Sequence, residues 1–447
     1  MAPSMSTSST RPATAGMRFA STRNSDSTVG FGAALLQGLA PDGGLYVPNA
    51  WPRVEPESLP VELAPLAAQL LAPFVAGDEF ASALPAACAE AFNFPAPAVS
   101  LPGEAALQVL ELFHGPTAAF KDFGARFLAA SMARLRKPAG LPLTILVATS
   151  GDTGGAVAAA FHGRPGIEVA VLFPKGLVSP TQERQLTCWG GNVRSFAVRG
   201  TFDDCQRMVK QAFQDPQLRA RKELSSANSI NLGRLLPQAV YYAATSLKVW
   251  RESGSPASFV IPSGNLGNAM ACLWARKIGL PIGRIVLAHN ANRTVPDYLD
   301  SGTWRPRPSV ATLASAMDVG DPSNMERMRA LFPELRDLRW AVTAYSVDDA
   351  QIRASITRGF QTFGQMWCPH TATAAEVYTR LSEDERRSGP WVLVSTAHAA
   401  KFPEIVEPLI GRKVPVPEAL QKLFARATAC TEIDADLAAL RASLLEA

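Results

Sequence analysis

The chain has 447 residues, of which 47% are hydrophobic and 18% charged, and this length predicts two or three packed units rather than one domain. The formal net charge is only +4 and the basic residues are spread along the chain, which argues against a nucleic-acid surface. No apolar run approaches the roughly 20 residues of a membrane helix, and six scattered cysteines without a C-x-x-C pair argue against a metal knuckle or a disulfide framework.

The first hundred residues predict a tail followed by a small domain. Residues 1–16 are rich in Ser, Thr, Ala and Pro and lack acids, so we expect a disordered extension before a second possible start at Met17. Residues 17–100 contain few long strand signals, and we expect them to form a small N-terminal domain. The Pro- and Ala-rich residues 92–102 are typical of a linker to the remaining residues, 101–447.

The segment HGPTAAFKDF, residues 114–123, places a lysine among apolar neighbours. Its Gly-Pro pair predicts a turn, and Thr117 can cap a helix, so Lys121 would lie in the first helical turn. The apolar positions of this helix include residues 120, 123, 127, 128 and 132. The positive end of the helix dipole and the apolar neighbours would both lower the pKa of the Lys121 amine. A neutral lysine amine is what Schiff-base chemistry requires. The alternative is a solvated surface residue, which is the usual setting of a lone lysine.

Strand–loop–helix units follow this segment. An apolar run at residues 143–148 predicts a buried strand, and it is followed by a polar loop at 149–155. An Ala-rich stretch at 156–161 predicts a helix, and residues 169–173 predict the next strand. Strands that alternate with helices indicate a parallel sheet covered on both faces.

The same order returns later in the chain. Residues 259–261 predict a strand, and a polar glycine loop and a helix that runs to Lys277 follow it. Further strands are predicted at residues 285–288 and 391–394. Ligands of parallel sheets bind beyond the carboxyl ends of the strands, so we expect the loops after these strands to form the functional site.

Two of these loops have the residues of an anion-binding site. The first suits a phosphate, because its glycines allow close approach of backbone N–H groups at a helix start; it consists of Ser263, Gly264, Asn265, Leu266, Gly267 and Asn268. The second suits a carboxylate, because Thr149, Ser150 and Thr153 supply hydroxyls beside N–H groups. An ordinary tight turn and an ordinary helix-capping loop are the respective alternatives.

Several segments together resemble the threonine synthase family. Residues 114–123 look like the cofactor-lysine motif of that family, and the other similar segments appear in the family's order over roughly residues 17–405. These segments are residues 21–23, 37–48, 149–154, 228–231, 262–267, 316–319, 369–372 and 396–402. A chance match of one segment is plausible, but a chance match of all of them in order is not.

The resemblance implies a fold and a reaction. The fold is α/β: two parallel-sheet α/β domains of the fold type II pyridoxal-phosphate enzymes (tryptophan synthase β-like), in residues 101–447, plus the small N-terminal domain. The cofactor is pyridoxal 5'-phosphate. The reaction converts O-phospho-L-homoserine and water to L-threonine and phosphate, the last step of threonine biosynthesis.

The resemblance also implies roles for single residues. Lys121 carries the cofactor, and the loop from Ser263 to Asn268 binds its phosphate. Asp152, at a position often occupied by Asn in relatives, lies near the cofactor's 3'-oxygen, and the Thr396 hydroxyl lies at the pyridine nitrogen. Taken alone, Thr396 would be read as a helix-capping hydroxyl.

The phosphate of the substrate needs fixed cationic partners. The candidates are Lys175, Arg184 and Arg234, each of which could instead be a solvated charge. His114, His370 and His398 lie in segments that resemble the family, but a lone histidine is usually a packed residue, so we assign none of them a proton-transfer role.

Two other functions remain open from the sequence. A phospho-lyase acting on O-phosphothreonine or O-phosphoserine would have nearly the same motifs, and a non-catalytic protein could have retained the fold. Apart from the small-molecule substrate we expect no nucleic-acid or membrane partner, a monomer or a homodimer, and a location in the reducing cytoplasm, because the scattered cysteines indicate no disulfides.

Overall fold

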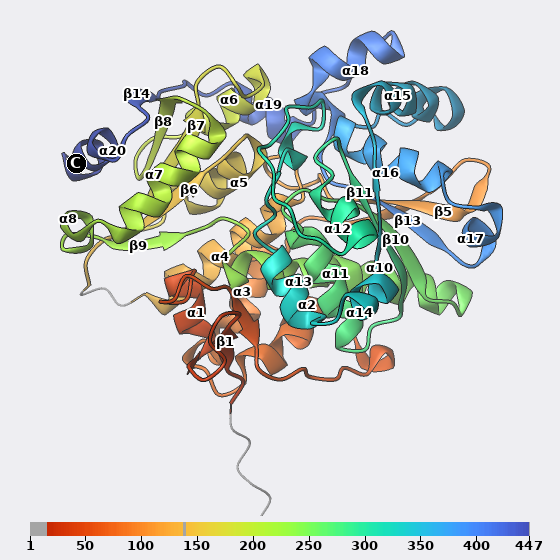
Figure 1. Ribbon diagram of the computed structural model, residues 1–447, viewed down its shortest axis with the longest axis horizontal. Helices are drawn as coiled ribbons and strands as arrows, with labels where there is room; N and C mark the ends of the chain where they lie inside the picture. Colours follow the sequence, from red (N-terminus) through yellow and green to blue (C-terminus); the bar gives the residue numbers. More distant parts are fainter. Residues whose placement is uncertain (1–15, 137–139, 447) are drawn as a thin grey trace, which may run out of the picture.

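The computed structural model describes residues 16–136 and 140–446 of the chain (Figure 1). The predicted disordered extension lies, except for its last residue, outside the described residues. None of the helices in these two ranges is long and apolar enough to cross a membrane. The described chain contains a three-stranded antiparallel sheet near its N-terminus and two larger sheets of five and six strands.

Short strands and helices make up the N-terminal part. In chain order these are β1 (Phe19–Ser21), β2 (Thr28–Val29), α1 (Phe31–Gln37), β3 (Tyr46–Pro48), η1 (Pro56–Ser58), α2 (Leu63–Leu71), η2 (Ala72–Val75), η3 (Glu79–Ala83) and α3 (Leu84–Ala91). The strand order is β2-β1-β3, and Phe19 pairs with Val29 on one side and Pro48 on the other.

The five-stranded sheet is parallel throughout. Its elements are β6 (Leu143–Ala148), α5 (Asp152–Phe161), β7 (Ile167–Pro174), α6 (Pro180–Thr187), β8 (Val193–Arg199), α7 (Phe202–Gln214), α8 (Pro216–Arg219), β9 (Glu223–Ser226) and, from the C-terminal end, β14 (Thr431–Asp434) and α20 (Leu437–Leu445). The strand order is β14-β8-β7-β6-β9. Side chains alternate along β6: Ile145 shares a buried cluster with Val157 of α5, whereas Leu146 packs with Met208 of α7. Helices therefore cover both faces of this sheet.

The six-stranded sheet has the remaining strands and most of the helices. Its elements and their connections are β4 (Ala98–Leu101), β5 (Glu104–Glu111), α4 (Lys121–Leu135), α9 (Leu232–Leu235), η4 (Leu236–Gln238), α10 (Ala239–Ser253), β10 (Ala257–Pro262), α11 (Gly267–Lys277), β11 (Ile282–His289), α12 (Thr294–Ser301), η5 (Ser315–Met317), α13 (Met325–Leu331), α14 (Leu335–Ala341), β12 (Thr343–Ser346), α15 (Asp349–Phe363), α16 (Pro369–Thr379), α17 (Glu383–Arg387), β13 (Trp391–Ser395), η6 (Ala399–Lys401), α18 (Pro403–Ile410) and α19 (Glu418–Phe424). The strand order is β12-β11-β10-β13-β5-β4, and all neighbours are parallel except β4 and β5.

The predicted strands are confirmed, because residues 143–148, 169–173, 259–261, 285–288 and 391–394 lie within β6, β7, β10, β11 and β13. Each of these segments is a short apolar run that is buried in the structure, as the interior of a parallel sheet requires. The two α/β units with parallel sheets and the small N-terminal sheet agree with the predicted fold class.

The linker predicted at residues 92–102 is wrong in its second half. Ala98–Leu101 forms β4, which pairs antiparallel with β5 at the edge of the six-stranded sheet. Val99 and Ser100 are exposed in this strand, so it lacks the apolar run that marked the interior strands.

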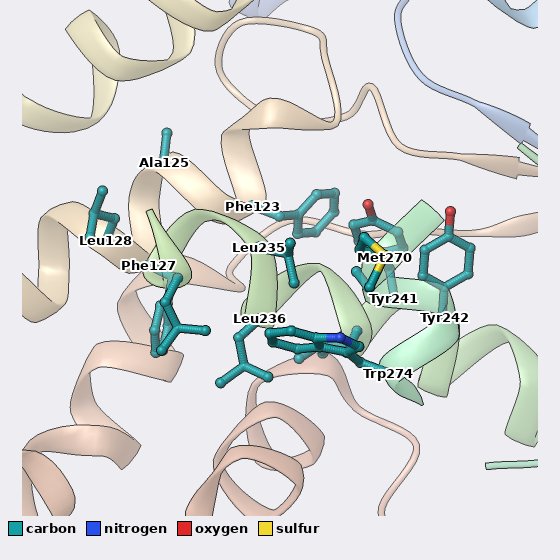
Figure 2. Packing of buried hydrophobic residues seen from close by; sticks show 14 of the residues in the cluster. Phe123, Ala125, Phe127, Leu128, Leu235, Leu236, Tyr241, Tyr242, Met270 and Trp274 are labelled. Carbon is teal, nitrogen blue, oxygen red and sulfur yellow. The ribbon is translucent and has the colours of Figure 1, made fainter. Parts of the chain in front are cut away.

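The helix predicted around Lys121 exists as α4, but its start differs from the prediction. Thr117 is not the N-cap: α4 begins at Lys121 and is preceded by Phe120, which makes no side-chain cap. Of the predicted apolar positions, 123, 127, 128 and 132 are buried and Phe120 is partly buried. The ring of Phe123 lies 4.5 Å from that of Phe94 and 5.3 Å from that of Tyr241 (Figure 2). Burial of such an aromatic side chain stabilises the fold by about 2–3 kcal/mol, so α4 is held firmly behind the site.

Candidate functional site

One cavity lies where the loops after β6, β10 and β13 meet the start of α4. Its lining includes the predicted residues Lys121, Thr149, Ser150, Asp152, Thr153, Arg234, Ser263, Gly264, Asn265, Leu266, Gly267, Asn268 and Thr396. The cavity is therefore at the carboxyl ends of the parallel strands, as predicted. Among the predicted site residues, Arg184 and Lys175 are not part of the lining.

Backbone contacts fix the segment that carries Lys121. The Phe120 N–H donates to the Thr396 carbonyl at 2.8 Å, and the His398 N–H donates to the Ala118 carbonyl at 3.0 Å. Ala118 has a φ of 51°, in the left-handed region that a non-glycine residue rarely adopts. The turn before α4 is thus clamped to the chain that continues from β13, which holds Lys121 and Thr396 at the same cavity.

Thr117 stabilises this turn in a way that the sequence analysis did not predict. Its N–H and its hydroxyl donate to the two carboxylate oxygens of Asp122, at 2.8 and 2.7 Å. Gly115 leaves the necessary space, because a Cβ at that position would lie 2.5 Å from an Asp122 oxygen. The Asp122 carboxylate therefore binds the turn to the first turn of α4.

The environment of Lys121 lowers the pKa of its amine to about 8. Burial is the main cause, and the positive charges of Lys401 and Arg234 act in the same direction. The carboxylate of Asp152 opposes these effects. The direction agrees with the prediction, and a lysine with this pKa is uncharged far more often near neutral pH than an ordinary lysine.

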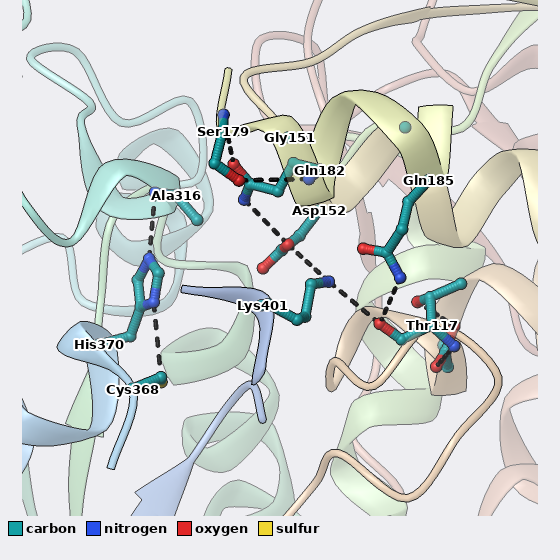
Figure 3. Close-up of polar contacts among 12 residues, drawn as sticks. Thr117, Gly151, Asp152, Ser179, Gln182, Gln185, Ala316, Cys368, His370 and Lys401 are labelled. Atoms are coloured by element: carbon teal, nitrogen blue, oxygen red, sulfur yellow. Dashed lines mark hydrogen bonds and ion pairs between the residues drawn. The ribbon is translucent and has the colours of Figure 1, made fainter. Parts of the chain in front are cut away.

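Asp152 is the buried first residue of α5, and it forms an ion pair that the sequence analysis missed (Figure 3). Its Oδ1 lies 2.7 Å from Nζ of Lys401 and accepts a hydrogen bond from Nε2 of Gln182 at 3.1 Å. Burial alone would raise the pKa of Asp152, but the charges of Lys401 and Lys121 lower it well below its ordinary value. Asp152 is therefore a carboxylate at neutral pH.

The hydroxyl of Thr149 is engaged within its own loop. It accepts hydrogen bonds from the N–H groups of Gly151 and Gly154, both at 3.0 Å, and donates one to the Gly151 carbonyl. This arrangement orders the loop, in line with the capping alternative for this side chain. Ser150 and Thr153 also line the cavity.

The glycine loop after β10 is packed against backbone. A Cβ on Gly264 would lie 2.7 Å from Cα of Met317, so only glycine fits there without a shift. Leu266 has a φ of 63°, and α11 begins directly after it. Asn265 holds the loop in place, because its Nδ2 donates to Oγ of Ser229 at 2.6 Å and its Oδ1 accepts the Ser323 N–H at 2.5 Å.

Two buried donors at the cavity fit a phosphate-bearing group. Among the described residues, Asn268 Nδ2 and Arg234 Nε have no hydrogen-bond partner. Asn268 is fixed, because its Oδ1 accepts the hydroxyls of Tyr241 and Tyr242 at 2.6 and 2.7 Å. Burial lowers the pKa of Arg234 only to about 10, so it stays charged. A buried donor without a partner costs about 1–3 kcal/mol, which an oxygen-rich ligand would recover. The residues present therefore fit pyridoxal phosphate.

The other predicted cations lie elsewhere. Arg184 is on the exposed side of α6 and is not part of the cavity lining. Lys175 is exposed and lies 2.5 Å from Glu432. His370 does line the cavity, where burial lowers its pKa to about 4 and its Nε2 accepts the Ala316 N–H at 3.1 Å. It is a neutral, packed histidine at neutral pH.

Two parallel-sheet units that meet at the carboxyl ends of their strands, with a lysine amine in the cavity, are the arrangement of the fold type II pyridoxal-phosphate enzymes. Family models support this class: one described as "Pyridoxal-phosphate dependent enzyme" matches residues 92–397, "Threonine synthase N terminus" matches 18–92, and "Threonine synthase, C-terminal" matches 371–443.

Individual proteins agree with the family models. The threonine synthase of Haemophilus influenzae is 41% identical over 95% of this chain and 98% of its own length. The crystal structure of the Escherichia coli threonine synthase superposes with a TM-score of 0.87 at 37% identity, over 96% of this chain and 99% of that one. A pyridoxal-phosphate-bound threonine synthase from Brucella melitensis gives 0.86 at 34% identity, with the same two coverages. The chain belongs to the threonine synthase family, and its cofactor is pyridoxal phosphate.

Proposed function

We propose that Lys121 binds the cofactor covalently and transfers the protons of the reaction. In this reaction the chain converts O-phospho-L-homoserine and water to L-threonine and phosphate. The observation that carries the proposal is the Lys121 amine, which lines the cavity and whose pKa burial lowers to about 8. Such an amine can act as a nucleophile and as a base near neutral pH.

The cofactor would be held by groups from three loops. We assign its phosphate to the loop from Ser263 to Asn268, where an unpaired Asn268 amide and the start of α11 support anion binding. Asp152 would lie beside its 3'-oxygen. The Thr396 hydroxyl would face its ring nitrogen, which a hydroxyl cannot keep protonated as a carboxylate would. With its ring nitrogen unprotonated, the cofactor would withdraw electrons less strongly, which suits elimination and replacement.

Pyridoxal phosphate, when bound, supplies an aldehyde that takes up an amino group and a ring that delocalises negative charge. The Lys121 amine would accept one proton from Cα of the substrate and then one from Cβ, after which phosphate leaves from Cγ. It would return one proton to Cγ and, after water has added at Cβ, one proton to Cα. Arg234, buried and charged beside the cavity, would hold the substrate phosphate, while Ser150 and Thr153 would hold the substrate carboxylate.

Four further points are inferences from composition and resemblance. We infer a cytoplasmic location, since all six cysteines are unpaired among the described residues. We also infer that no nucleic acid is a partner and that the chain acts as a monomer or a homodimer. Residues 17–100 and 101–447 would be the N-terminal domain and the catalytic region.

The test combines a labelling experiment with a product assay. Borohydride treatment of the holoenzyme followed by peptide mapping should place the reduced cofactor on Lys121. Lys121→Ala should lose threonine formation from O-phospho-L-homoserine by at least about 1000-fold. Threonine production by this variant at the native rate would overturn the proposal, and release of ketobutyrate and ammonia by the wild type would favour the phospho-lyase alternative.

A further inference from the structure

Lys401 is a fully buried lysine next to the cavity but outside its lining. It ends η6, and its Nζ lies 2.7 Å from Asp152 Oδ1 and donates to the Thr117 carbonyl at 3.0 Å (Figure 3). Asp152 itself does line the cavity. Lys401 therefore contacts Asp152 from the side away from the cavity. It is a positioning residue and not a catalytic one.

Asp152 influences two lysines. The charged or titratable groups that act on the Lys121 amine are Asp152 of α5, Lys401 of η6 and Arg234 of α9, and His370 of α16 is coupled to the same amine. Of these four groups only Asp152 raises the pKa of Lys121. His370 is neutral near pH 7 because burial lowers its pKa to about 4.

A buried carboxylate must be paired with a cation or with hydrogen-bond donors. Lys401 is the cation that pairs with Asp152 within the part of the chain that the structure describes. If this cation were removed, Lys121 would become the counterion of Asp152, and the proton would be held on its amine. A protonated amine cannot attack an aldehyde.

We propose that Lys401 neutralises Asp152 from behind the cavity, so that Lys121 is released from pairing with this carboxylate and is available as a free amine. This inference rests on the proposed role of Lys121. It assigns Lys401 to the control of the nucleophile, in addition to its hydrogen bond with the Thr117 carbonyl.

A purely structural role would also follow from the contacts of Thr117. Its carbonyl accepts both Lys401 Nζ and Nε2 of Gln185, the latter at 3.1 Å, so Lys401 helps to order the turn before α4. Loss of activity alone would not separate the two roles. The titration of the Lys121 amine does separate them, because an ordering role does not require a shift in that titration.

The experiment measures the pKa of Lys121 directly. The full-length protein freed of pyridoxal phosphate is acetylated with a trace of acetic anhydride at a series of pH values, and the labelling of Lys121 is read by mass spectrometry. In the wild type the labelling should be half-maximal near pH 8, the value set by the surroundings of Lys121. In Lys401→Met the midpoint should rise by about one pH unit or more, as expected when the charge of Asp152 at the same cavity is no longer opposed by that of Lys401.

Two further variants complete the test. Lys222→Met is the matched control, because Lys222 is also buried and pairs with a carboxylate, that of Glu168 at 2.6 Å, but Glu168, unlike Asp152, does not line the cavity. Its Lys121 midpoint should equal that of the wild type. The double variant Lys401→Met with Asp152→Asn removes both charges, and its midpoint should be at or below that of the wild type. This variant leaves no buried unpaired charge and serves as the test should Lys401→Met fail to fold.

The outcomes distinguish this inference from the proposed function. An unchanged midpoint in Lys401→Met, or a midpoint above the wild-type value in the double variant, overturns the role of Lys401 and leaves Lys121 as the cofactor lysine. Failure of borohydride to fix the cofactor on Lys121 of the wild type overturns the proposed function itself.

Discussion

Replacement of Gly264 by alanine should weaken the binding of pyridoxal phosphate about 100-fold. The added methyl group would lie 2.7 Å from Cα of Met317 and 3.2 Å from the carbonyl carbon and oxygen of the same residue. Carbon atoms in contact are about 3.5–4.0 Å apart, so one of the two backbones must move by roughly 1 Å. Neither is a flexible side chain that could turn away. Loss of one or two hydrogen bonds to a charged group costs about 3 kcal/mol, which corresponds to roughly 100-fold in Kd.

The assay is a titration of the cofactor-free protein with pyridoxal phosphate, followed by absorbance. Gly155→Ala is the control, in helix α5 at the same cavity, because its new methyl group would lie 3.4 Å from Cβ of Gln185, an ordinary contact. The control should bind the cofactor within about threefold of the wild type. Equal affinities for Gly264→Ala and Gly155→Ala would refute the reasoning that the loop needs glycine for its approach to Met317.

Further predictions concern the substrate phosphate, the core and acid stability. Arg234→Gln should lower kcat/KM about 100-fold and Arg184→Gln should leave it within about threefold, as measured with O-phospho-L-homoserine; equal values would argue against phosphate binding by Arg234. Arg327→Met should lower the free energy of unfolding by about 3 kcal/mol, because it removes a buried guanidinium. That guanidinium donates hydrogen bonds to the carbonyls of residues 46, 229 and 230 and to the Asn324 side chain. The control Arg336→Met, at an exposed position, should change the melting temperature little. Burial lowers the pKa of His289 to about 3, below its ordinary value near 6.5. Below about pH 6.5 the unfolded chain therefore binds a proton at this histidine that the folded chain does not bind, and the free energy of unfolding decreases. Between pH 6.5 and 5 this amounts to about 2 kcal/mol, so His289→Gln should show a smaller fall in melting temperature than the wild type over that range.

The parallel strands and the loops that follow them could be predicted because their signals are local. Each interior strand is buried on both faces and therefore appears as an apolar run, as in residues 143–148. The polar loops directly after such runs lie at the carboxyl edge of the sheet by geometry alone. This is why residues as far apart as Thr149 and Thr396 could be expected at one cavity.

The remaining features depend on contacts between distant segments. The role of Lys401 was missed because Thr117, one of its partners, lies 284 positions earlier in the chain. Its apolar surroundings, AAKF, were a usable signal, since a lysine among such residues is expected to be buried and paired. Thr117 has the residue type of a helix cap, but its partner is the Asp122 side chain, and this contact depends on how the turn before α4 folds. The edge strand β14 has only one buried residue, Ile433, so it carries little periodic signal.

The pairing of β5 with β13 has a consequence for synthesis of the protein. β5 leads into the Lys121 segment, yet its parallel neighbour Trp391–Ser395 is among the last strands of the chain to be made. At about 5–20 residues per second, the ribosome needs on the order of tens of seconds to complete the intervening chain. During that time one side of the strand that leads to the reactive lysine has no partner. The nascent chain therefore exposes unpaired backbone N–H and C=O groups beside apolar side chains of β5, which chaperones can recognise. Translation pauses before residue 391 should therefore lower the yield of native enzyme more than pauses after the last strand.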